Sequence, residues 1–415
     1  MKVGIIGLGY VGLPLAVAFA EAGHQVIGID VEPERVAAVN QGSSHVEDVP
    51  SKRLRGVEDR LVASTSYAEL EHAEAILVCV PTPLSANREP ELGPLVDAAA
   101  ALATVLTRDQ LIVLESTTYP GTTRERLLPI LERSGLAGGR DFHLAYSPER
   151  VDPGRTDHTM RSTPKVVGGL TDACGDRAEA LYRNICDEVV RVSTSEVAEL
   201  SKLLENIFRS VNIALVNELA VLADRMGIDV WEVIDAAATK PYGFMRFDPG
   251  PGMGGHCLPV DPFYLSWRAR EYDFVPEFVE LAGKMNQAMP YVCVERIVRA
   301  LNDAGKAVRG SRIVLLGVAY KPGVGDTRES PALKILELLR EHGGDVVYHD
   351  PHVHDLPQFD LSSTDLDAAL DGADLAVIVT AHPELDLERV VRESPLVMDL
   401  RGVTRGIEEP GVVRL

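Results

Sequence analysis

The order of hydrophobic and polar residues predicts alternating strands and helices in the first part of the chain. Residues 2–6 form a short apolar run typical of a buried strand, residues 13–22 predict a helix, and residues 24–29 form the next strand. Further buried strands are predicted at 75–80, 111–115, 143–146, 165–168 and 189–192. Buried strands that alternate with helices indicate a parallel sheet with helices on both faces.

The pattern becomes helical after residue 193. Residues 195–226 predict one unusually long helix, with Ser195 placed to cap its start and Gly227 to end it. Shorter helices are predicted at 230–238, 261–270, 274–287 and 290–304, after which strands return at 312–318, 345–349, 375–380 and 396–400, with a helix at 332–342. We therefore predict an α/β chain in which two doubly wound domains, 1–193 and 311–415, are joined by an all-helical middle domain, 194–304, with a long central helix.

A glycine-rich turn, Gly7-Leu-Gly-Tyr-Val-Gly12, joins the first strand to the first helix. In a Rossmann-like turn of this kind the first glycine allows the tight bend, the second lets a pyrophosphate approach the backbone, and the third lets the helix pack on the strand. Asp30 ends the second strand, where it would bind the adenosine ribose and repel a 2′-phosphate, which favours NAD over NADP. A glycine-rich turn without a ligand is the alternative. The residues assigned to the cofactor in this unit are Gly7, Gly9, Tyr10, Val11, Gly12, Asp30 and Arg35.

Polar residues follow several predicted strands, at the edge where open α/β sheets bind ligands. Pro81 and Thr82 interrupt the strand at 75–80, and Thr117 follows the strand at 111–115. Both threonines are expected to line the cleft, although either hydroxyl could equally complete a turn. Glu149 follows the strand at 143–146 and is a candidate acid or base, with a solvated surface charge as the alternative.

Two other groups of charged residues are candidates for a ligand site. Lys321 and Arg328 lie just past the strand at 312–318, where they could hold a phosphate or simply be surface charges. The long helix carries a polar stripe at i, i+3, i+7 and i+10, formed by Glu199, Lys202, Asn206 and Arg209. Because much of the remaining circumference is apolar, Lys202 and Asn206 could face an enclosed polar space; a solvated stripe is the alternative.

The loop Gly250-Pro-Gly-Met-Gly-Gly-His-Cys-Leu-Pro-Val-Asp-Pro262 contains one cysteine among four glycines and three prolines. Glycine permits backbone conformations closed to other residues, and proline fixes φ, so such a loop can hold a side chain in a set place. Cys257 is therefore a candidate nucleophile, because a thiol with an accessible thiolate can attack a carbonyl. A buried structural cysteine is the alternative.

The composition limits the ligands to be expected. A net charge of −21 over 415 residues argues against nucleic acid and against an anionic membrane surface, while a small phosphorylated ligand needs only a local basic cluster. The five cysteines include no Cys-x-x-Cys pair, which favours a reduced cytoplasmic protein without a metal centre. His349, His352 and His354 are interpreted as part of a surface loop. No apolar run is judged long enough to span a bilayer.

Seven segments resemble the nucleotide-sugar 6-dehydrogenases, the family of UDP-glucose, UDP-N-acetylglucosamine and UDP-N-acetylmannosamine dehydrogenases. They are GLGYVGLP at 7–14, CVPTP at 79–83, ESTTYPGTT at 115–123, AYSPER at 145–150, KLLEN at 202–206, GPGMGGHCLPVDP at 250–262 and AYKPGVGDTRESPA at 319–332. The resemblance runs essentially from end to end. It implies two Rossmann-like domains, with NAD in the first and most of the nucleotide diphosphate in the second, and a homodimer formed through the helical domain.

The resemblance also implies a reaction. NAD takes two hydrides from C6 of a nucleotide hexose (UDP- or dTDP-glucose, or UDP-N-acetylglucosamine), giving the uronic acid through a thiohemiacetal and a thioester on Cys257. Lys202 and Asn206 match the donors that stabilise the oxyanion, Asp261 matches a carboxylate that assists proton transfer, and Glu149 and Thr117 match residues that position the hydrolytic water. Pro81, Thr82, Thr117 and Arg328 join the cofactor set, and the substrate set is Glu149, Arg150, Lys202, Asn206, Arg246, Gly254 and Lys321.

The sequence leaves the sugar and the base open. The Gly-His-Cys loop resembles the N-acetylhexosamine branch, whereas Arg246 is charged where that branch is expected to be neutral, so glucose stays possible. Uracil and thymine differ by one methyl group, which an apolar pocket distinguishes by only ~1–3 kcal/mol. A two-electron dehydrogenase of the hydroxyacid type and a catalytically silent nucleotide-binding relative are the alternative functions. The retention of Cys257, Lys202 and Asn206 argues against the silent relative.

Overall fold

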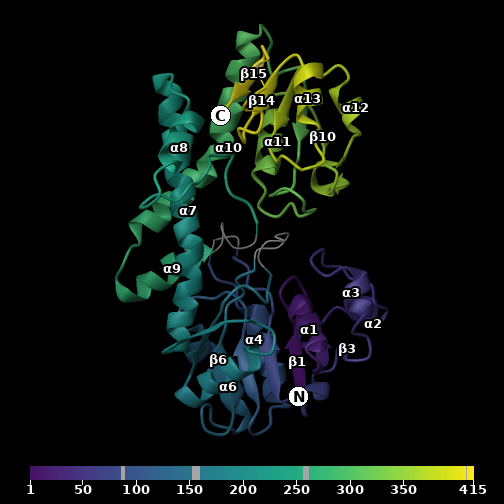
Figure 1. Ribbon diagram of the computed structural model, residues 1–415, viewed down its shortest axis with the longest axis vertical. Helices are drawn as coiled ribbons and strands as arrows, with labels where there is room; N and C mark the ends of the chain where they lie inside the picture. The colour runs from purple at the N-terminus through teal and green to yellow at the C-terminus, as the bar shows by residue number, and fades with distance from the viewer. Residues whose placement is uncertain (86–88, 152–158, 256–260, 408) are drawn as a thin grey trace. The chain divides into compact units, whose positions relative to one another are not determined.

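The computed structural model describes residues 1–415 except 86–88, 152–158, 256–260 and 408 (Figure 1). The chain forms two compact units. The first consists of Met1–Glu205 with Phe263–Phe274, and the second of Asn206–Pro262 with Val275–Leu415. The division between them falls inside the long helix α7, Ser195–Met226, which the sequence predicts with the same bounds.

An eight-stranded sheet forms the centre of the first unit, in the order β3-β2-β1-β4-β5-β6-β7-β8. The strands are β1 Lys2–Ile6, β2 Gln25–Ile29, β3 Leu61–Ser64, β4 Ala75–Val78, β5 Leu111–Leu114, β6 His143–Tyr146, β7 Lys165–Gly169 and β8 Val189–Val192. All neighbouring pairs are parallel except β6 and β7, in which Tyr146 faces Gly168 in an antiparallel register. The start of β7 therefore lies beside the carboxyl end of β6.

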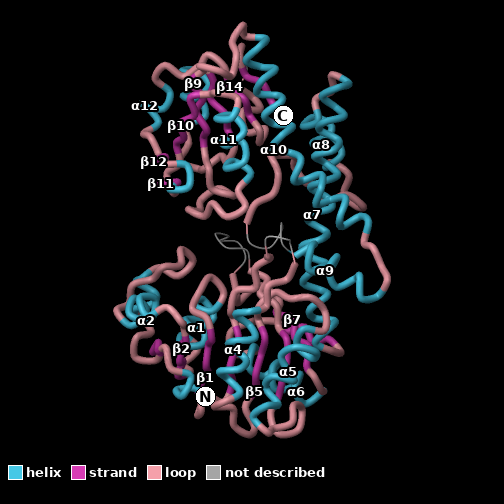
Figure 2. Tube along the Cα trace, turned by 180° about the vertical axis from the view of Figure 1, so that it is seen from behind, coloured by secondary structure: helices cyan, strands magenta, loops and turns pink. Residues whose placement is uncertain are grey.

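Helices cover both faces of this sheet (Figure 2). They are α1 Gly12–Glu21, α2 Pro33–Asn40, α3 Ser51–Arg55, α4 Gly93–Ala103, α5 Leu128–Leu131 and α6 Asp172–Tyr182, with a π-helical turn, Thr123–Leu127, before α5. Successive residues of a strand point to opposite faces. Accordingly Ile5 packs in the cluster that contains α1 and α6, while Ile6 packs in the cluster that contains α4 and α5. The central strands, such as β1, β4 and β5, are thus apolar on both faces, as the sequence pattern predicts.

The helical segments follow the predicted order with one correction. After α7 come α8 Val230–Ala238, α9 Asp261–Ala269 and α10 Glu277–Asp303. The prediction of two helices at 274–287 and 290–304 is wrong, because α10 continues through Pro290. Proline in a helix costs one hydrogen bond and crowds the preceding turn. Here its ring is buried, and Met289 and Cys293 beside it pack into the hydrophobic core of the second unit.

The α7 helix is long and apolar enough to cross a membrane by length and composition alone, with a mean hydropathy of 1.2 in its most apolar window. This finding differs from the expectation that the chain contains no such segment. About 44% of that window is buried within the protein, and core helices of water-soluble proteins pass the same test. The polar residues of α7 are spaced along one stripe, so a search for an uninterrupted apolar run does not detect the helix.

A five-stranded parallel sheet forms the rest of the second unit, in the order β10-β9-β13-β14-β15. Its strands are β9 Arg312–Leu316, β10 Asp345–His349, β13 Leu375–Ile378, β14 Val397–Asp399 and β15 Val412–Arg414. The helices are α11 Pro331–Glu341, α12 Leu366–Leu370 and α13 Leu387–Glu393, and a small hairpin pairs β11 Asp355–Leu356 with β12 Leu361–Ser362. The predicted fold class is confirmed, with β15 as a strand that the sequence analysis did not predict.

Candidate active site

The glycine turn after β1 has the geometry that a dinucleotide requires. Gly7 has a φ of +90°, and a Cβ placed on Gly12 would lie 1.7 Å from the carbonyl oxygen of Gly7, so neither position accepts a side chain. A Cβ on Gly9 would meet no atom within 4 Å. The first and third glycines are therefore needed by the fold, whereas the second leaves open space where a pyrophosphate could approach the backbone. These residues fit NAD.

Asp30 lies at the carboxyl end of β2, as predicted, and is 4% exposed. Its carboxylate accepts hydrogen bonds from the backbone N–H groups of Leu8 at 2.8 Å and Glu32 at 3.0 Å. Arg35 forms an ion pair with it at 3.0 Å, and the Arg35 side chain is 37% exposed. The sequence analysis assigned both residues to the cofactor. The structure shows that Arg35 neutralises Asp30, so a ribose hydroxyl would share the carboxylate with the guanidinium.

The loops after β4 and β5 are tied together by the residues predicted to line the cleft. Thr82 donates its hydroxyl hydrogen bond to the carbonyl of Thr117 at 2.7 Å, and Ser116 donates to the carbonyl of Val80 at 2.6 Å. The carbonyl of Thr82 in turn accepts a hydrogen bond from the Tyr264 hydroxyl at 2.8 Å. The side chain of Thr82 therefore completes a loop contact, as the alternative interpretation allowed.

Glu149 and Arg150 are held in place beyond β6. One carboxylate oxygen of Glu149, Oε1, accepts hydrogen bonds from the N–H groups of Arg150 at 2.7 Å and Val151 at 2.6 Å. Arg150 binds the carbonyl of Pro164 at 2.6 Å and forms an ion pair with Glu205 at 2.7 Å. Glu149 is therefore a positioned, partly buried carboxylate with a 17% exposed side chain, and not a solvated surface charge.

The polar stripe on α7 divides into residues with different surroundings. Glu199 is fully buried and accepts hydrogen bonds from the N–H of Gly121 at 2.6 Å and from the N–H and hydroxyl of Thr123 at 2.8 Å and 2.7 Å. Burial raises the pKa of Glu199 to about 7, although these hydrogen bonds oppose the shift. Lys202 is half-buried and forms no ion pair within the described residues. Glu199 thus anchors the 116–123 loop, and Lys202 keeps its ammonium group available.

In the second unit, Asn206 is 3% exposed and donates a hydrogen bond through Nδ2 to Asp261, which is 2% exposed. Asp261 is the first residue of α9. Cys257 lies outside the described residues, so its predicted role is untested. The structure nevertheless brings two of the predicted catalytic side chains into contact, and one of them lies four residues after Cys257.

The start of the cysteine loop is fixed by two asparagines that the sequence analysis missed. Asn217 accepts a hydrogen bond from the N–H of Gly250 at 2.9 Å and donates one to Asn286 at 3.0 Å. Asn286 donates to the carbonyl of Ser210 at 3.0 Å. Both amides are buried. Polar side chains on the apolar faces of two predicted helices were the available signal, because buried amides need partners.

The same loop packs closely against the segment that follows β9. The N–H of Gly255 donates to the carbonyl of Arg328 at 3.0 Å, and a Cβ on Gly254 would lie 2.7 Å from Cβ of Tyr320. Gly254, predicted as a substrate residue, is therefore a close-packing glycine. Arg328 forms an ion pair with Asp326 at 2.7 Å, and the ammonium of Lys321 lies 5.7 Å from the ring centre of Tyr320.

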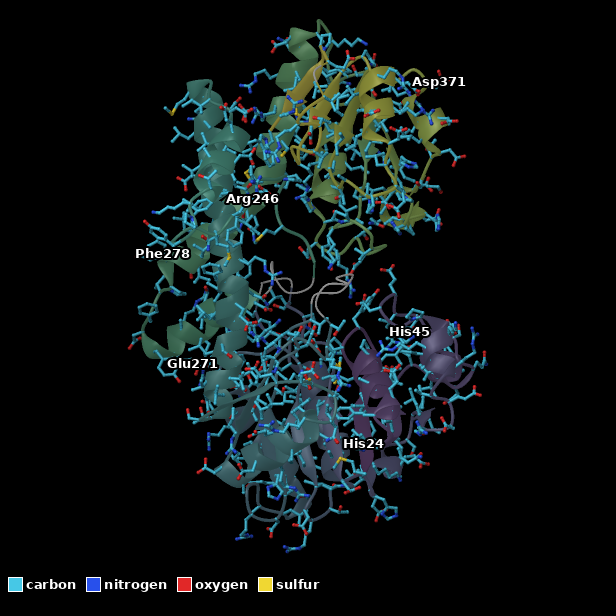
Figure 3. The ribbon with its side chains drawn as sticks, in the orientation of Figure 1. His24, His45, Arg246, Glu271, Phe278 and Asp371 are labelled. Atoms are coloured by element: carbon cyan, nitrogen blue, oxygen red, sulfur yellow. The ribbon has the colours of Figure 1, made fainter. Side chains whose placement is uncertain are left out.

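Two arginines near this loop differ from the sequence analysis. Arg246, predicted to bind substrate and labelled in Figure 3, forms ion pairs with Asp235 at 2.7 Å and Asp248 at 2.9 Å. Its charge is therefore balanced within the protein. Arg401 was not predicted. It lies just past β14, donates through Nε to the carbonyl of Val379 at 2.7 Å, and a Cβ on Gly250 would lie 2.7 Å from its guanidinium. Its position after a strand end was the available signal.

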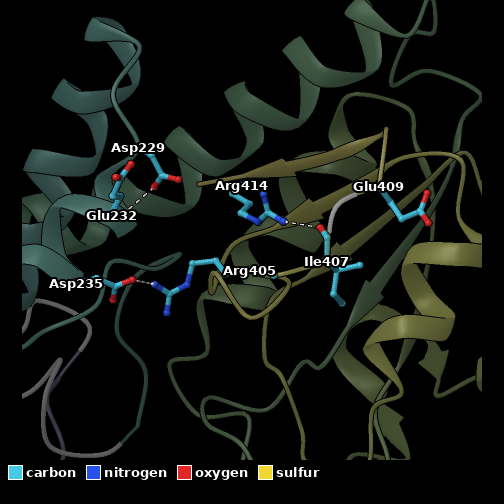
Figure 4. A pocket seen from close by; sticks show the side chains of 8 residues that line it. Asp229, Glu232, Asp235, Arg405, Ile407, Glu409 and Arg414 are labelled. Carbon is cyan, nitrogen blue, oxygen red and sulfur yellow. Dashed lines mark hydrogen bonds and ion pairs between the residues drawn. The ribbon is translucent and has the colours of Figure 1, made fainter.

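The second unit also contains a cavity of about 330 Å³, between α8 and the segment before β15 (Figure 4). Its lining includes Asp229, Glu232, Asp235, Arg405 and Arg414. Arg405 is paired with Asp235 at 2.7 Å, and Arg414 donates to the carbonyls of Thr404 and Ile407. Both arginines are thus occupied, Arg405 by a carboxylate of the lining and Arg414 by backbone carbonyls. None of the predicted site residues lines this cavity.

A group of His352, His382 and Glu384 has ligand atoms within 4.8 Å of one another, which is close enough for a metal ion. His382, however, accepts a hydrogen bond from the N–H of Gly323 at 3.1 Å and faces the buried carboxylate of Asp350 at 3.1 Å. Both ring nitrogens of His382 therefore already have partners: Nδ1 accepts from Gly323, and Nε2 faces Asp350. A metal ion bound to either nitrogen would have to replace one of these contacts. The prediction that the chain holds no metal stays a prediction.

Comparisons with known proteins agree with the glycine turn and with the order of the domains. Residues 1–186, 196–288 and 314–406 match the NAD binding, central and UDP binding domains of the UDP-glucose/GDP-mannose dehydrogenase family. The chain is 36% identical to UDP-N-acetyl-D-mannosamine dehydrogenase of Pyrococcus horikoshii, over 98% of this chain and 100% of that protein. It is 38% identical to UDP-N-acetyl-D-glucosamine 6-dehydrogenase of Pseudomonas aeruginosa, over 85% of this chain and 83% of that protein.

The solved structure of UDP-D-ManNAc dehydrogenase from P. horikoshii superimposes with a TM-score of 0.90 at 35% identity, covering 100% of this chain and 98% of that one. The predicted family, cofactor and fold class are thereby confirmed. The chain belongs to the UDP-glucose/GDP-mannose dehydrogenase family and is an NAD-dependent oxidoreductase of nucleotide sugars.

Proposed function

We propose that the enzyme oxidises the C6 hydroxyl of a UDP-N-acetylhexosamine to the carboxylate in two successive steps, with Cys257 as the covalent nucleophile. The observation that carries this proposal is the buried hydrogen bond between Asn206 and Asp261 at the end of the cysteine loop. Burying an amide and a carboxylate costs free energy that their mutual hydrogen bond offsets only in part, and buried polar pairs of this kind are frequent at functional sites. The amide chain of Asn217 and Asn286 supports the same loop.

The proposed reaction runs through two covalent species on Cys257. NAD⁺ accepts the hydride from C6 in each oxidation step. The thiolate of Cys257 adds to the C6 aldehyde and forms a thiohemiacetal, and its oxidation leaves a thioester. Water then breaks the C–S bond and releases the acid. Covalent capture divides a four-electron oxidation into steps that each have a manageable barrier.

The chain's own residues have separate roles in this scheme. Lys202 and Asn206 lie one turn apart on α7 and are proposed to donate hydrogen bonds to the oxyanion at C6. A positioned donor of this kind contributes about 3–4 kcal/mol to transition-state stabilisation. Asp261 assists proton transfer at the thiol, and Glu149 and Thr117 position the hydrolytic water. Lys321 and Arg328 are proposed to interact with the charged parts of the bound nucleotides.

The choice of an N-acetylhexosamine rests on the two relatives named above, which act on UDP-N-acetyl-D-mannosamine and UDP-N-acetyl-D-glucosamine. Arg246 was the residue that argued for glucose. Its two ion pairs remove that argument, because a charge balanced by Asp235 and Asp248 need not meet the sugar. UDP-glucose and dTDP-glucose are retained as comparison substrates.

We further propose a homodimer in the cytoplasm. The α7 helix exposes large apolar side chains at spacings of three, four and seven residues: Val197, Leu200, Leu204, Phe208, Leu215, Leu219 and Leu222. On α10, Phe278, which Figure 3 labels, is 79% exposed and Leu281 is 61% exposed. Exposed apolar side chains at helical spacing along a helix are typical of a subunit interface. The free, buried thiols of Cys79, Cys174, Cys186 and Cys293 support a reducing compartment.

The test is the stoichiometry of NADH release with UDP-ManNAc, UDP-GlcNAc, UDP-glucose and dTDP-glucose, measured beside Cys257→Ala. Two NADH per sugar with an N-acetylhexosamine, lost in the variant, are expected. One NADH per sugar in both proteins would show that Cys257 is not the nucleophile and that the enzyme is a two-electron dehydrogenase. Two NADH with a glucose substrate alone would overturn the choice of sugar and keep the chemistry.

A further inference from the structure

A buried ionic cluster of Glu115, Lys165 and Tyr182 lies at the carboxyl edge of the eight-stranded sheet. The ammonium of Lys165 forms an ion pair with Glu115 at 2.7 Å, and the hydroxyl of Tyr182 donates to the other oxygen of the same carboxylate. The side chains of Lys165 and Glu115 are 5% and 0% exposed, and Tyr182 is fully buried. None of the catalytic or binding roles proposed above involves Glu115, Lys165 or Tyr182.

The antiparallel pairing of β6 with β7 brings Lys165 to this edge. Lys165 is the first residue of β7, and because β7 runs against β6 its start lies beside the carboxyl end of β6. Glu115 directly follows β5, and Glu149 follows β6 by three residues. In a fully parallel sheet the first residue of the strand would lie at the opposite edge. The topology thus places a lysine where open α/β sheets bind ligands.

The ammonium of Lys165 contacts three oxygens. It donates to Glu115 at 2.7 Å and to the carbonyl of Pro148 at 3.0 Å, and it lies 3.8 Å from Oε2 of Glu149. The other oxygen of Glu149 is held by the two backbone N–H groups of Arg150 and Val151. The carboxylate is therefore fixed at one oxygen, while Oε2 faces the lysine at ion-pair distance. Oε2 accepts no hydrogen bond from another described residue, so it can still accept one from water.

A buried ion pair is weak evidence for a role in stability. Moving a carboxylate and an ammonium out of water costs several kcal/mol each, and well-packed apolar side chains often serve the fold as well or better. Here a single ammonium also faces two carboxylates, Glu115 and Glu149, which carry one negative charge more than it balances. A functional role of Glu149 explains this arrangement better than a contribution to the stability of the fold does.

We propose that Lys165 is a positioning residue for Glu149: held by its contacts with Glu115 and Pro148, its ammonium lies 3.8 Å from Oε2 and fixes the Glu149 carboxylate so that Oε2 can take a proton from water. The inference rests on the proposed thioester chemistry. In that step the water oxygen bonds to the thioester carbon, the C–S bond breaks with its electron pair on the sulfur of Cys257, and the water proton passes to Oε2. A base that is already protonated cannot accept this proton.

The charge of Lys165 depends on the groups that face this cluster. Burial lowers the pKa of Lys165, but the attraction of Glu115 and Glu149 more than compensates, so the net shift is upward and the lysine keeps its proton. The other titratable groups that interact with the cluster are Cys79 and Cys186, and neither is a cation. Arg150, the residue after Glu149, is paired with Glu205 at 2.7 Å.

The first experiment measures coupling without any turnover. Melting temperatures near neutral pH are compared for the wild type, Lys165→Met, Glu149→Gln and the double variant. Lys165→Met should lower the melting temperature, because it leaves two carboxylates together, and adding Glu149→Gln should restore part of the loss. If the two losses simply add, Lys165 does not act on Glu149 and the proposal is wrong.

The second experiment measures the step itself. The charge-balanced pair Glu115→Gln with Lys165→Met removes one charge of each sign, so it leaves the net charge of the cluster unchanged and guards against misfolding. In this variant we expect thioester hydrolysis in single turnover to slow by about 10- to 100-fold, with acylated enzyme visible by mass spectrometry. Lys165→Arg should restore much of the rate.

Tyr182→Phe is the matched control, since it removes a hydrogen bond to Glu115 but keeps the lysine beside Glu149. It should lower the melting temperature and leave the rate of thioester hydrolysis close to that of the wild type. A wild-type rate of thioester hydrolysis in the charge-balanced variant would overturn the proposal. If the wild type released only one NADH per sugar, the proposed function would fail instead, and the melting-temperature comparison would still decide whether Lys165 acts on Glu149.

Discussion

Replacing Glu199 by glutamine should change the pH dependence of stability in the first unit. Glu199 is fully buried on α7, and its burial raises its pKa from 4.5 to about 7. A carboxyl group with a raised folded-state pKa contributes its full stability below the unfolded value and loses it as the pH rises through the folded value. At 1.36 kcal/mol per pH unit, the difference corresponds to about 3 kcal/mol. Glutamine resembles the protonated acid and does not titrate.

The expected result follows from the upward direction of the pKa shift of Glu199. Near pH 5 the wild type and Glu199→Gln should differ little, because both keep one acceptor oxygen for the N–H and hydroxyl of Thr123, and in both the other arm carries hydrogen where the N–H of Gly121 donates. Toward pH 8 the wild type must ionise a buried group, and the variant should become the more stable protein by most of about 3 kcal/mol. The hydrogen bonds from Gly121 and Thr123 reduce this effect and are already included in the pKa.

The assay must report on the first unit alone, because two compact units need not unfold together. The chain has two tryptophans. Trp267 lies in the first unit, with its ring centre 5.1 Å from that of Tyr119 in the loop that Glu199 holds. Urea unfolding followed by Trp267 fluorescence in a Trp231→Phe background isolates that unit. Trp231 lies in the second unit, where it binds the carbonyl of Leu415.

Glu196→Gln is the matched control, one turn earlier on the same helix. Glu196 is partly exposed and paired with Arg124 at 2.6 Å, and although burial opposes the shift, this contact and its hydrogen bonds lower its pKa. Its stability contribution is therefore lost only at acid pH, so the control difference should be flat between about pH 5 and pH 8. The reasoning is refuted if the Glu199→Gln difference is equally flat, or if it grows in favour of the wild type as the pH rises.

Three further predictions concern the glycine turn after β1, the start of the cysteine loop and the exposed surface of α7. Gly9→Ala should keep the wild-type melting temperature but weaken NADH binding in a fluorescence titration, whereas Gly12→Ala should destabilise the first unit itself, since its Cβ would lie 1.7 Å from the Gly7 carbonyl. Asn217→Ala should cost the second unit about 2–4 kcal/mol, measured by Trp231 fluorescence, and lower kcat while NAD affinity is kept. Leu215→Asp with Leu219→Asp should halve the mass in sedimentation equilibrium, and an unchanged mass would place the subunit contact elsewhere.

The sequence correctly predicted the features that depend on residues close to one another along the chain. The glycine turn and Asp30 follow from backbone geometry within one strand-turn-helix unit, and the bounds of α7 follow from its periodicity and its flanking Ser195 and Gly227. The roles of Glu199 and Glu149 could not be predicted in the same way. Each depends on backbone N–H groups or a cation contributed by residues distant in sequence, such as Gly121 or Lys165. The predicted break in the helix at Pro290 is wrong for a related reason. Packing in the core of the second unit outweighs the tendency of proline to end a helix.

The two Rossmann-like sheets carry carboxylates at equivalent strand ends, but the surroundings of these carboxylates differ. Asp350 follows β10 as Asp30 follows β2, and Gly317 after β9 has a φ of +79°, much as Gly7 has +90° after β1. Asp350 accepts hydrogen bonds from the backbone N–H groups of Val318, Ala319, His352 and Val353, and it faces His382. Burial raises the pKa of Asp350, but His382 and these N–H groups outweigh it and lower the pKa to about 2.

The difference between the two carboxylates matches the division of ligands between the domains. Asp30 has two backbone donors and one half-exposed guanidinium, which a ribose can displace or share. Asp350 is fully buried and has four backbone donors and an imidazole, so no capacity is left for a ribose hydroxyl. Its carboxylate instead shapes the loop that carries Tyr320 and Lys321. A dinucleotide fingerprint therefore requires an available acid as well as a strand end, and of these two carboxylates Asp30, within residues 1–186 that match an NAD binding domain, meets both conditions.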